Sequence, residues 1–165
     1  MKAVVLAAGE GQRLRPLTFT RPKHLIPVGG KPLLEHLFVA LKEAGIKDAL
    51  VVVHYKAERI KDYFGDGSKL GMRINYAFQK EMQGTADAFG FAQNYVDGDF
   101  FAVYGDLLLT SGVIESVLNL HNEAKPTATL TAVHVEHPEY YGVLKTEGQK
   151  VVGIVEKPAP EVGTD

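Results

Sequence analysis

Three short, unbroken apolar runs recur along the chain at residues 4–8, 49–53 and 100–104. Runs of this length without polar alternation are typical of strands that are buried on both faces, as in a parallel sheet. Residues 72–78 alternate apolar with polar side chains, and residues 127–135 are rich in β-branched side chains. Both segments therefore predict further strands.

Helical patterns lie between these strands. Apolar residues at helical spacing over residues 33–41 predict an amphipathic helix, and Gly45 is a typical glycine cap for it. The other expected elements are a short helix around residues 60–64, a helix from Thr85 to about Tyr95, a helix that begins at Ser111 and a hairpin around Glu147-Gly148. This alternation predicts an α/β fold, with a mostly parallel sheet and helices on both of its faces.

The composition excludes several classes of protein. A chain of 165 residues with 45% hydrophobic and 23% charged residues is typical of one globular domain. The formal net charge of −2 argues against a nucleic-acid partner bound through bulk electrostatics. The absence of cysteine excludes disulfides and thiolate chemistry. The first apolar run is too short for a signal sequence or a membrane span, so we expect a cytoplasmic protein with no membrane partner.

A long loop rich in glycine and proline follows the first predicted strand. Residues 9–32 contain four glycines and four prolines, which excludes a long helix there. Ligands of open α/β sheets bind beyond the carboxyl ends of the strands, and the N–H groups of a glycine-rich turn can hold phosphate. Arg13 and Lys23 add positive charge to this loop, although a tight turn with solvated cations explains them equally well. The segment is not a dinucleotide-binding fingerprint, because Leu14 occupies the place of the third glycine.

Two further strand ends carry polar residues. Asp106 follows the strand at 100–104, where one carboxylate and substrate phosphates together suit Mg²⁺, although Asp is also a common cap. Gln79 follows another strand, and its amide offers a donor and an acceptor to a base edge. Gly84-Thr85 then opens a helix. Taken alone, Gln79 and Gly84-Thr85 are better explained as a strand end and a helix cap.

The six histidines do not show the spacing of a metal site, and structural or surface roles are expected for them. His24 and His54 merit attention, because both lie near the expected ligand side of the sheet.

Several segments match, in order, one pattern that extends over essentially the whole chain. They are Leu6-Ala7-Ala8-Gly9, Gly11, Arg13-Leu14, Pro16-Leu17-Thr18, Pro22-Lys23, Pro27-Val28, Gln79, Gly84-Thr85-Ala86, Gly105-Asp106, Tyr141-Gly142 and Val155-Glu156-Lys157-Pro158. This pattern resembles the signature of the sugar-1-phosphate nucleotidylyltransferases. It is most similar to the glucose-1-phosphate thymidylyltransferase branch and its archaeal relatives with dual sugar specificity.

The resemblance implies a reaction and a set of roles. The phosphate oxygen of a sugar-1-phosphate attacks the α-phosphorus of a nucleoside triphosphate, with dTTP or UTP favoured, and pyrophosphate leaves. Arg13 then holds the β- and γ-phosphates, Lys23 bridges the α-phosphate and the attacking phosphate, and Asp106 holds Mg²⁺. The implied nucleotide-binding residues are Leu6, Ala7, Ala8, Gly9, Gly11, Arg13, Gln79, Gly84 and Thr85. The implied sugar-phosphate-binding residues are Gly142, Glu156 and Lys157.

The resemblance also implies a Rossmann-like three-layer sandwich with a mostly parallel mixed sheet, the nucleotide-diphospho-sugar transferase fold. We expect residues 1–165 to form one nucleotidyltransferase domain that is incomplete at the C-terminus, because relatives supply a second metal-binding residue and closing elements after Glu156-Lys157-Pro158. Gln12 replaces a usual Thr, with little expected effect. A non-catalytic regulatory relative that binds nucleotides or nucleotide sugars, and an inactive fragment of the enzyme, stay open as alternatives. A homo-oligomer is compatible with the resemblance.

Overall fold

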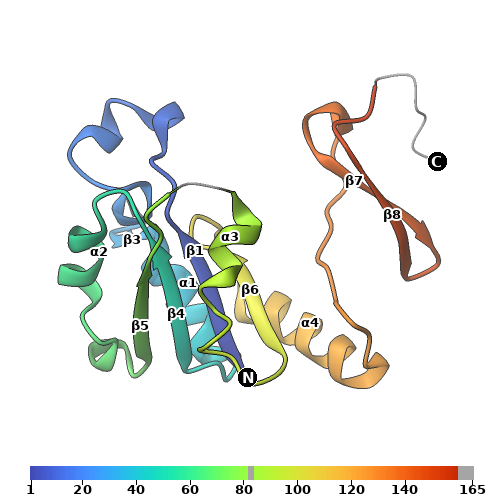
Figure 1. Cartoon of the computed structure of the whole chain (residues 1–165), viewed down its shortest axis with the longest axis horizontal. Coiled ribbons are helices and arrows are strands. Elements are labelled where there is room, and N and C mark those ends of the chain that lie inside the picture. Colours follow the sequence, from blue (N-terminus) through green and yellow to red (C-terminus); the bar gives the residue numbers. More distant parts are fainter. Residues whose placement is uncertain (82–83, 160–165) are drawn as a thin grey trace. The chain divides into compact units, whose positions relative to one another are not determined.

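Four parallel strands form the central sheet of the computed structural model, which describes residues 1–81 and 84–159 (Figure 1). In spatial order the strands are β5 (Arg73–Phe78), β4 (Asp48–Val53), β1 (Lys2–Ala7) and β6 (Phe100–Tyr104). In register, Val5 of β1 faces Val51 of β4 and Val103 of β6. The three apolar runs and the alternating segment are thus confirmed as strands of one parallel sheet.

The chain divides into two compact units, Met1–Asn119 and Leu120–Asp165. The first unit contains the central sheet and the second contains a hairpin, and each is described by itself.

Helices cover both faces of the sheet, as predicted. Because successive strand residues point to opposite faces, Val5 and its alternate neighbours pack on one face, whereas Val4 and Leu6 pack on the other. The helices on the Val5 face are α1 (Leu33–Glu43), α2 (Ala57–Phe64) and α4 (Ser111–Ala124), and α3 (Thr85–Gly90) lies on the opposite face. Figure 1 shows α3 on the near side of the sheet and α1 on the far side. Within the described ranges, no helix combines the length and apolar character needed to cross a bilayer.

The end of α1 follows the predicted glycine cap. Gly45 has φ +86°, and the Ile46 N–H donates to the Leu41 carbonyl at 2.8 Å. A glycine in the left-handed region together with this hydrogen bond forms a Schellman motif. Ile46 is buried against the same core as Leu41, so the cap also directs the chain into β4.

The long loop between β1 and α1 contains only short elements, as its glycines and prolines predict. They are the 3₁₀ turns η1 (Gln12–Leu14), η2 (Leu17–Phe19) and η3 (Lys23–Leu25), followed by the two-residue strands β2 (Pro27–Val28) and β3 (Lys31–Pro32). Two further 3₁₀ turns are η4 (Ser68–Leu70) and η5 (Pro138–Tyr140).

The second unit contains the antiparallel hairpin of β7 (Gly142–Glu147) and β8 (Lys150–Glu156). Glu147 pairs with Lys150 across the turn, where Gly148 has φ +60°. Glycine adopts this backbone region without strain. The hairpin predicted around Glu147-Gly148 is therefore confirmed.

Two predicted elements differ in the structure. Residues 127–135, predicted as a strand, form no regular element and are largely exposed. A β-branched composition favours a strand only where a neighbouring strand supplies hydrogen bonds and a packed face, and no described strand pairs with this segment. The helix predicted from Thr85 to about Tyr95 ends at Gly90, and residues 91–95 continue as turns. Glycine costs about 1 kcal/mol relative to alanine inside a helix, which favours this early end.

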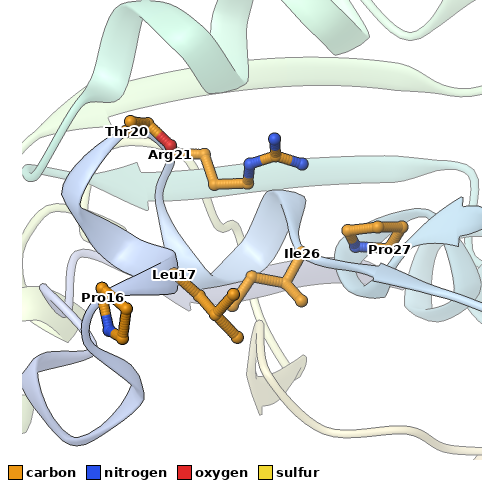
Figure 2. Close-up of a pocket in the computed structure, with 6 residues that line it drawn as sticks. All are labelled: Pro16, Leu17, Thr20, Arg21, Ile26 and Pro27. Carbon is orange, nitrogen blue, oxygen red and sulfur yellow. The ribbon is translucent and has the colours of Figure 1, made fainter.

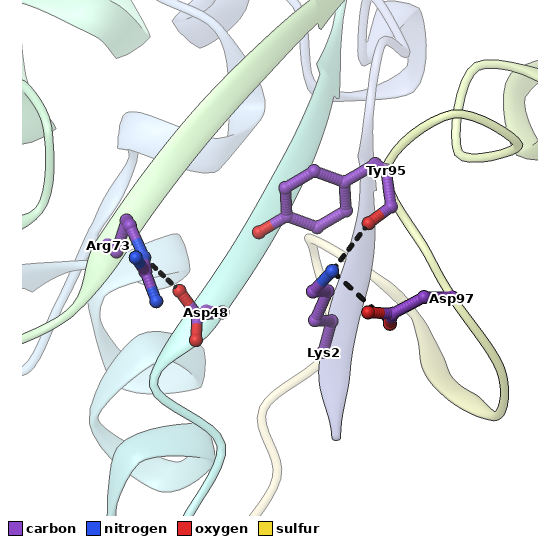
Figure 3. Close-up of polar contacts among 5 residues, drawn as sticks. All are labelled: Lys2, Asp48, Arg73, Tyr95 and Asp97. Carbon is purple, nitrogen blue, oxygen red and sulfur yellow. Dashed lines mark hydrogen bonds and ion pairs between the residues drawn. The ribbon is translucent and has the colours of Figure 1, made fainter.

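Ion pairs join the elements at the amino edge of the sheet (Figure 3). Lys2 Nζ donates to the Tyr95 carbonyl at 2.8 Å and lies 3.3 Å from Asp97. Arg73 and Asp48, which are register partners in β5 and β4, form an ion pair. A hydrogen bond from Arg73 lowers the pKa of Asp48. These exposed pairs stabilise the fold little, but they join β4 to β5 and join β1 to the segment that precedes β6.

Phe38 provides a test of the core. Its ring is fully buried in α1 and meets the Phe64 ring edge-to-face, with the centroids 5.0 Å apart. We expect Phe38→Ala to lower the free energy of unfolding by about 3–5 kcal/mol, because it leaves a cavity beneath the sheet. Urea denaturation measures this loss. Phe19→Ala is the matched control, since Phe19 is 58% exposed, and an equal loss in both variants would contradict the packing described.

Candidate active site

The carboxyl edge of the central sheet gathers the polar strand ends that the sequence indicates. Leu6 of β1 lies in register with Tyr104 of β6. Hydrogen bonds continue the pairing beyond the strands: Gly105 donates to the Leu6 carbonyl at 2.8 Å, and Gln79 donates to the Val53 carbonyl at 2.9 Å. The glycine-rich loop after β1 and the polar ends of β5 and β6 therefore begin at one edge of one sheet.

At the end of β1, only main-chain groups are available to a ligand. The side chains of Leu6, Ala7 and Ala8 are buried. Leu6 belongs to one core and Ala7 to the other. Any nucleotide contact by these three predicted residues is therefore limited to main-chain groups.

Lys23 lies against Gly9 and Gly11, the first two glycines of the loop. A Cβ added at Gly9 would lie 3.3 Å from Lys23 Nζ, and one added at Gly11 would lie 3.0 Å from Lys23 Cβ. Gly11 also has φ +68°, which other residues rarely adopt. The glycine-rich motif thus makes room for the Lys23 side chain, in addition to exposing its own N–H groups.

Lys23 and Asp106, which are 83 positions apart, form an ion pair. Lys23 Nζ lies 2.5 Å from Asp106 Oδ2, and the two side chains are 21% and 34% exposed. Burial by itself would raise the pKa of Asp106, but the hydrogen bond and the charge of Lys23 outweigh it, and the pKa lies below its usual value. The edge therefore holds an ionised carboxylate directly beside an ammonium group.

Arg13 lies on the same loop but outside this ion pair. It is exposed on η1, and no described residue holds its guanidinium by a hydrogen bond or an ion pair. The backbone before it is ordered by Gly11, whose carbonyl accepts from the Leu14 N–H at 2.9 Å and from Thr18 Oγ1 at 3.0 Å. The Tyr55 hydroxyl donates to the Thr18 carbonyl at 2.9 Å. The turn is thus fixed while the Arg13 donors face solvent.

His24 is fully buried directly behind the ion pair. Neither of its ring nitrogens has a hydrogen-bond partner among the described residues. Burial, with a smaller effect from the Lys23 charge and an opposing one from Asp106, lowers the pKa of His24 to about 4. A Cβ on Gly105 would lie 3.1 Å from His24 Cδ2. His24 is therefore a neutral ring packed against the glycine that precedes Asp106.

Gln79 is buried at the end of β5, with 2% of its surface exposed. Its Nε2 donates to Asp87 Oδ2 at 2.7 Å and lies 3.5 Å from the Gly84 carbonyl. Gly84, with φ +106°, and Thr85 stand where the chain enters α3. The structure therefore brings Gln79, Gly84 and Thr85 together, as expected of one binding segment.

Asp87 is a site residue that sequence reasoning misses. It stands in the first turn of α3, where an acidic residue is ordinarily explained by the helix dipole. The available signal was the amide of Gln79 eight positions earlier, but only the folded structure places the two side chains in contact.

The predicted sugar-phosphate residues lie in the second unit. Gly142 pairs with Glu156 in the hairpin, and a Cβ on Gly142 would lie 3.0 Å from Glu156 Oε2. The Lys157 N–H donates to the Tyr141 carbonyl at 2.9 Å. Gly142, Glu156 and Lys157 therefore gather at the open end of this hairpin, whereas the other predicted residues gather in the first unit.

A separate shallow hollow lies on the loop between β1 and α1 (Figure 2). Its volume is about 510 Å³, and its lining is mostly apolar. None of the residues with a predicted role lines it; the lining residues are Pro16, Leu17, Thr20, Arg21, Ile26 and Pro27.

Asp106 is the described residue best suited to help hold a metal. No group of three or more histidines or carboxylates in the described ranges is arranged as a metal site. A single carboxylate suits Mg²⁺ when substrate phosphates and water complete the shell. The site thus fits an ion that arrives with a phosphate ligand.

Known proteins are similar to this chain over nearly its whole length. A family model described as "Nucleotidyl transferase" matches residues 2–164. A low-salt glycan biosynthesis nucleotidyltransferase from Haloferax volcanii is 40% identical, over 96% of this chain and 45% of its own length. A glucose-1-phosphate thymidylyltransferase from Streptomyces antibioticus is 38% identical, over 96% and 45%. A UTP–glucose-1-phosphate uridylyltransferase from H. volcanii is 37% identical, over 96% and 65%.

A solved structure shares the fold. It is a Bacillus anthracis protein described as a glucose-1-phosphate thymidylyltransferase, in complex with a sucrose. The TM-score is 0.88 at 30% identity, over 96% of this chain and 65% of that one. The fold class expected from the sequence is therefore confirmed. The chain spans 45% of the length of the first two curated relatives named above and 65% of the third.

The buried His24 predicts a specific acid sensitivity. Between pH 6.5 and about 4, the unfolded chain protonates this histidine and the folded chain does not. The free energy of unfolding should therefore fall as the pH falls through that window, by up to about 3 kcal/mol. Urea unfolding at several pH values measures this. His24→Leu should flatten the dependence, whereas the control His134→Leu, at an exposed residue, should not; an unchanged slope in His24→Leu would contradict the expectation.

Proposed function

Because this chain belongs to the nucleotidyl transferase family, we propose that it serves nucleotidyl transfer from a nucleoside triphosphate to a sugar-1-phosphate. A phosphate oxygen of the sugar-1-phosphate attacks the α-phosphorus of the triphosphate. The bond from that phosphorus to the oxygen bridging to the β-phosphate breaks, so that pyrophosphate leaves and a nucleotide-sugar forms. The observation that carries the proposal is the Lys23–Asp106 ion pair beside the glycine-rich loop.

The ion pair suits this reaction because each of its two side chains can bind another group when a triphosphate arrives. The Lys23 ammonium can exchange the carboxylate for phosphate oxygens, and Asp106 is then available to hold Mg²⁺ together with those phosphates. The ion would neutralise the charge of the triphosphate. Phosphoryl transfer depends mainly on such positioning and charge neutralisation, and the glycines place the Lys23 side chain against the loop where the phosphates would lie.

Arg13 supplies the remaining positive charge. Its exposed guanidinium carries forked donors that match phosphate oxygens. We assign it to the β- and γ-phosphates, where it would stabilise the departing pyrophosphate.

We propose the substrates from the names of the relatives and from the two groups of predicted residues, one in each unit. The names of the relatives specify thymidylyl and uridylyl transfer to glucose-1-phosphate, which favours dTTP or UTP. Gln79 and its neighbours in the first unit would meet the base. The hairpin group of Gly142, Glu156 and Lys157 would meet the sugar phosphate.

Pyrophosphate release tests the proposal. Glucose-, N-acetylglucosamine- and mannose-1-phosphate are each paired with dTTP, UTP, GTP, CTP and ATP, with Mg²⁺ or with EDTA. We expect Mg²⁺-dependent release that is greatest with dTTP or UTP. Release that requires no sugar-1-phosphate would contradict transfer to a sugar. No release from any pair would favour a non-catalytic nucleotide-binding role for this chain.

Substitutions of Lys23 and Asp106 test the proposed roles most directly. Lys23→Ala should lower kcat by about 10²–10³-fold, the effect of removing one preorganised charge-stabilising donor. Asp106→Asn should raise the Mg²⁺ concentration needed for half-maximal rate. Lys31→Ala is the control, since Lys31 is an exposed lysine of the same loop. A Lys23→Ala rate within a few-fold of that control, or an unchanged Mg²⁺ titration of Asp106→Asn, would reject the corresponding role.

A further inference from the structure

We propose that Asp87 is a positioning residue that fixes the orientation of the Gln79 side-chain amide and thereby helps to select the base of the triphosphate. This inference rests on the proposed function of the same site. It assigns a role to a carboxylate that does not itself contact the reacting atoms.

The main chain of Gln79 is held on both sides. Its N–H donates to the Val53 carbonyl at 2.9 Å, and its carbonyl accepts from His54 Nδ1 at 2.7 Å. The His54 ring in turn stacks on Phe78, with the centroids 5.7 Å apart. The backbone of Gln79 is therefore anchored to the end of β4, and the amide orientation is the main freedom that its side chain retains.

Asp87 removes that remaining freedom. A carboxylate only accepts hydrogen bonds, so it can pair with the NH₂ end of the amide and not with the oxygen. Gln79 Nε2 lies 2.7 Å from Asp87 Oδ2, and its second hydrogen is directed by the Gly84 carbonyl at 3.5 Å. Only 2% of the residue is exposed, and the two ends of the amide are nearly equal in size, so hydrogen bonding decides which end faces Asp87.

Gln79 Oε1 is the end that this pairing leaves for a ligand. No donor among the residues that the structure describes pairs with it. An acceptor at this place favours a base that presents an N–H, such as the imide of thymine or uracil. Cytosine carries a bare ring nitrogen at the corresponding position, so the two acceptors would repel each other. Asp87 therefore favours imide bases through Gln79, without touching the base.

Asp87→Asn removes the acceptor-only constraint on the Gln79 amide with almost no change of shape. The new NH₂ group can donate to Gln79 Oε1, so the Gln79 amide can turn and present its own NH₂ outward. We expect the ratio of kcat/KM for dTTP or UTP to that for CTP to fall by about tenfold or more, the effect of one hydrogen bond gained or lost. Asp87→Glu keeps an acceptor-only group and should keep the wild-type ranking of bases. Asp62→Asn, at an exposed residue of α2, is the control for replacing an aspartate by an asparagine elsewhere in the chain.

The readouts separate this inference from a structural role and from failure of the proposed function. An equal loss for all triphosphates in Asp87→Asn would mean that Asp87 only stabilises the start of α3, and would overturn the inference. If the wild-type chain releases no pyrophosphate, the proposed function fails for this chain, and calorimetric Kd values for dTTP and CTP replace the rates. The same tenfold change in the Kd ratio supports the role of Asp87. An unchanged ratio, or no binding of either nucleotide, overturns it.

Discussion

The parallel pairing of β5, β4, β1 and β6 in that order places every loop of the first-unit site at one edge of one sheet. Parallel strands all present their carboxyl ends together, so residues far apart in sequence become neighbours without a dedicated scaffold. The opposite edge carries the exposed ion pairs of Lys2 and Arg73, which join elements and have no role in the proposed chemistry. The buried core thus stabilises the sheet, while the loops at its carboxyl edge carry the polar residues of the site.

Two polar side chains at the carboxyl edge are each held by a partner from another segment. Lys23 pairs with Asp106, and Gln79 pairs with Asp87. Partly buried charged and polar groups need such partners, because desolvation without them is costly. The same contacts orient the groups before any ligand arrives. The buried His24 ring, by contrast, is neutral, has no hydrogen-bond partner among the described residues and fills space against Gly105.

Patterns that depend on neighbours in sequence predict the local structure well. The apolar runs became β1, β4 and β6, and Gly45 ends α1 as expected. The strand expected over residues 127–135 is absent, because β-branched composition cannot by itself supply a pairing strand. The helix from Thr85 was predicted too long, because the apolar spacing continues beyond Gly90 while the helix does not.

The sequence by itself determined the class of fold, and it predicted the carboxyl edge of the sheet as the ligand side, with Arg13, Lys23, Gln79 and Asp106 as candidates, because burial patterns and motif spacing can be read along the chain. Tertiary structure alone decided that Lys23 meets Asp106, that the loop glycines make room for the lysine stem, and that Asp87 orients Gln79. These contacts join segments separated by a strand, a helix or a turn. Which side chains meet across such a separation depends on strand order and register, and those follow from packing of the whole sheet.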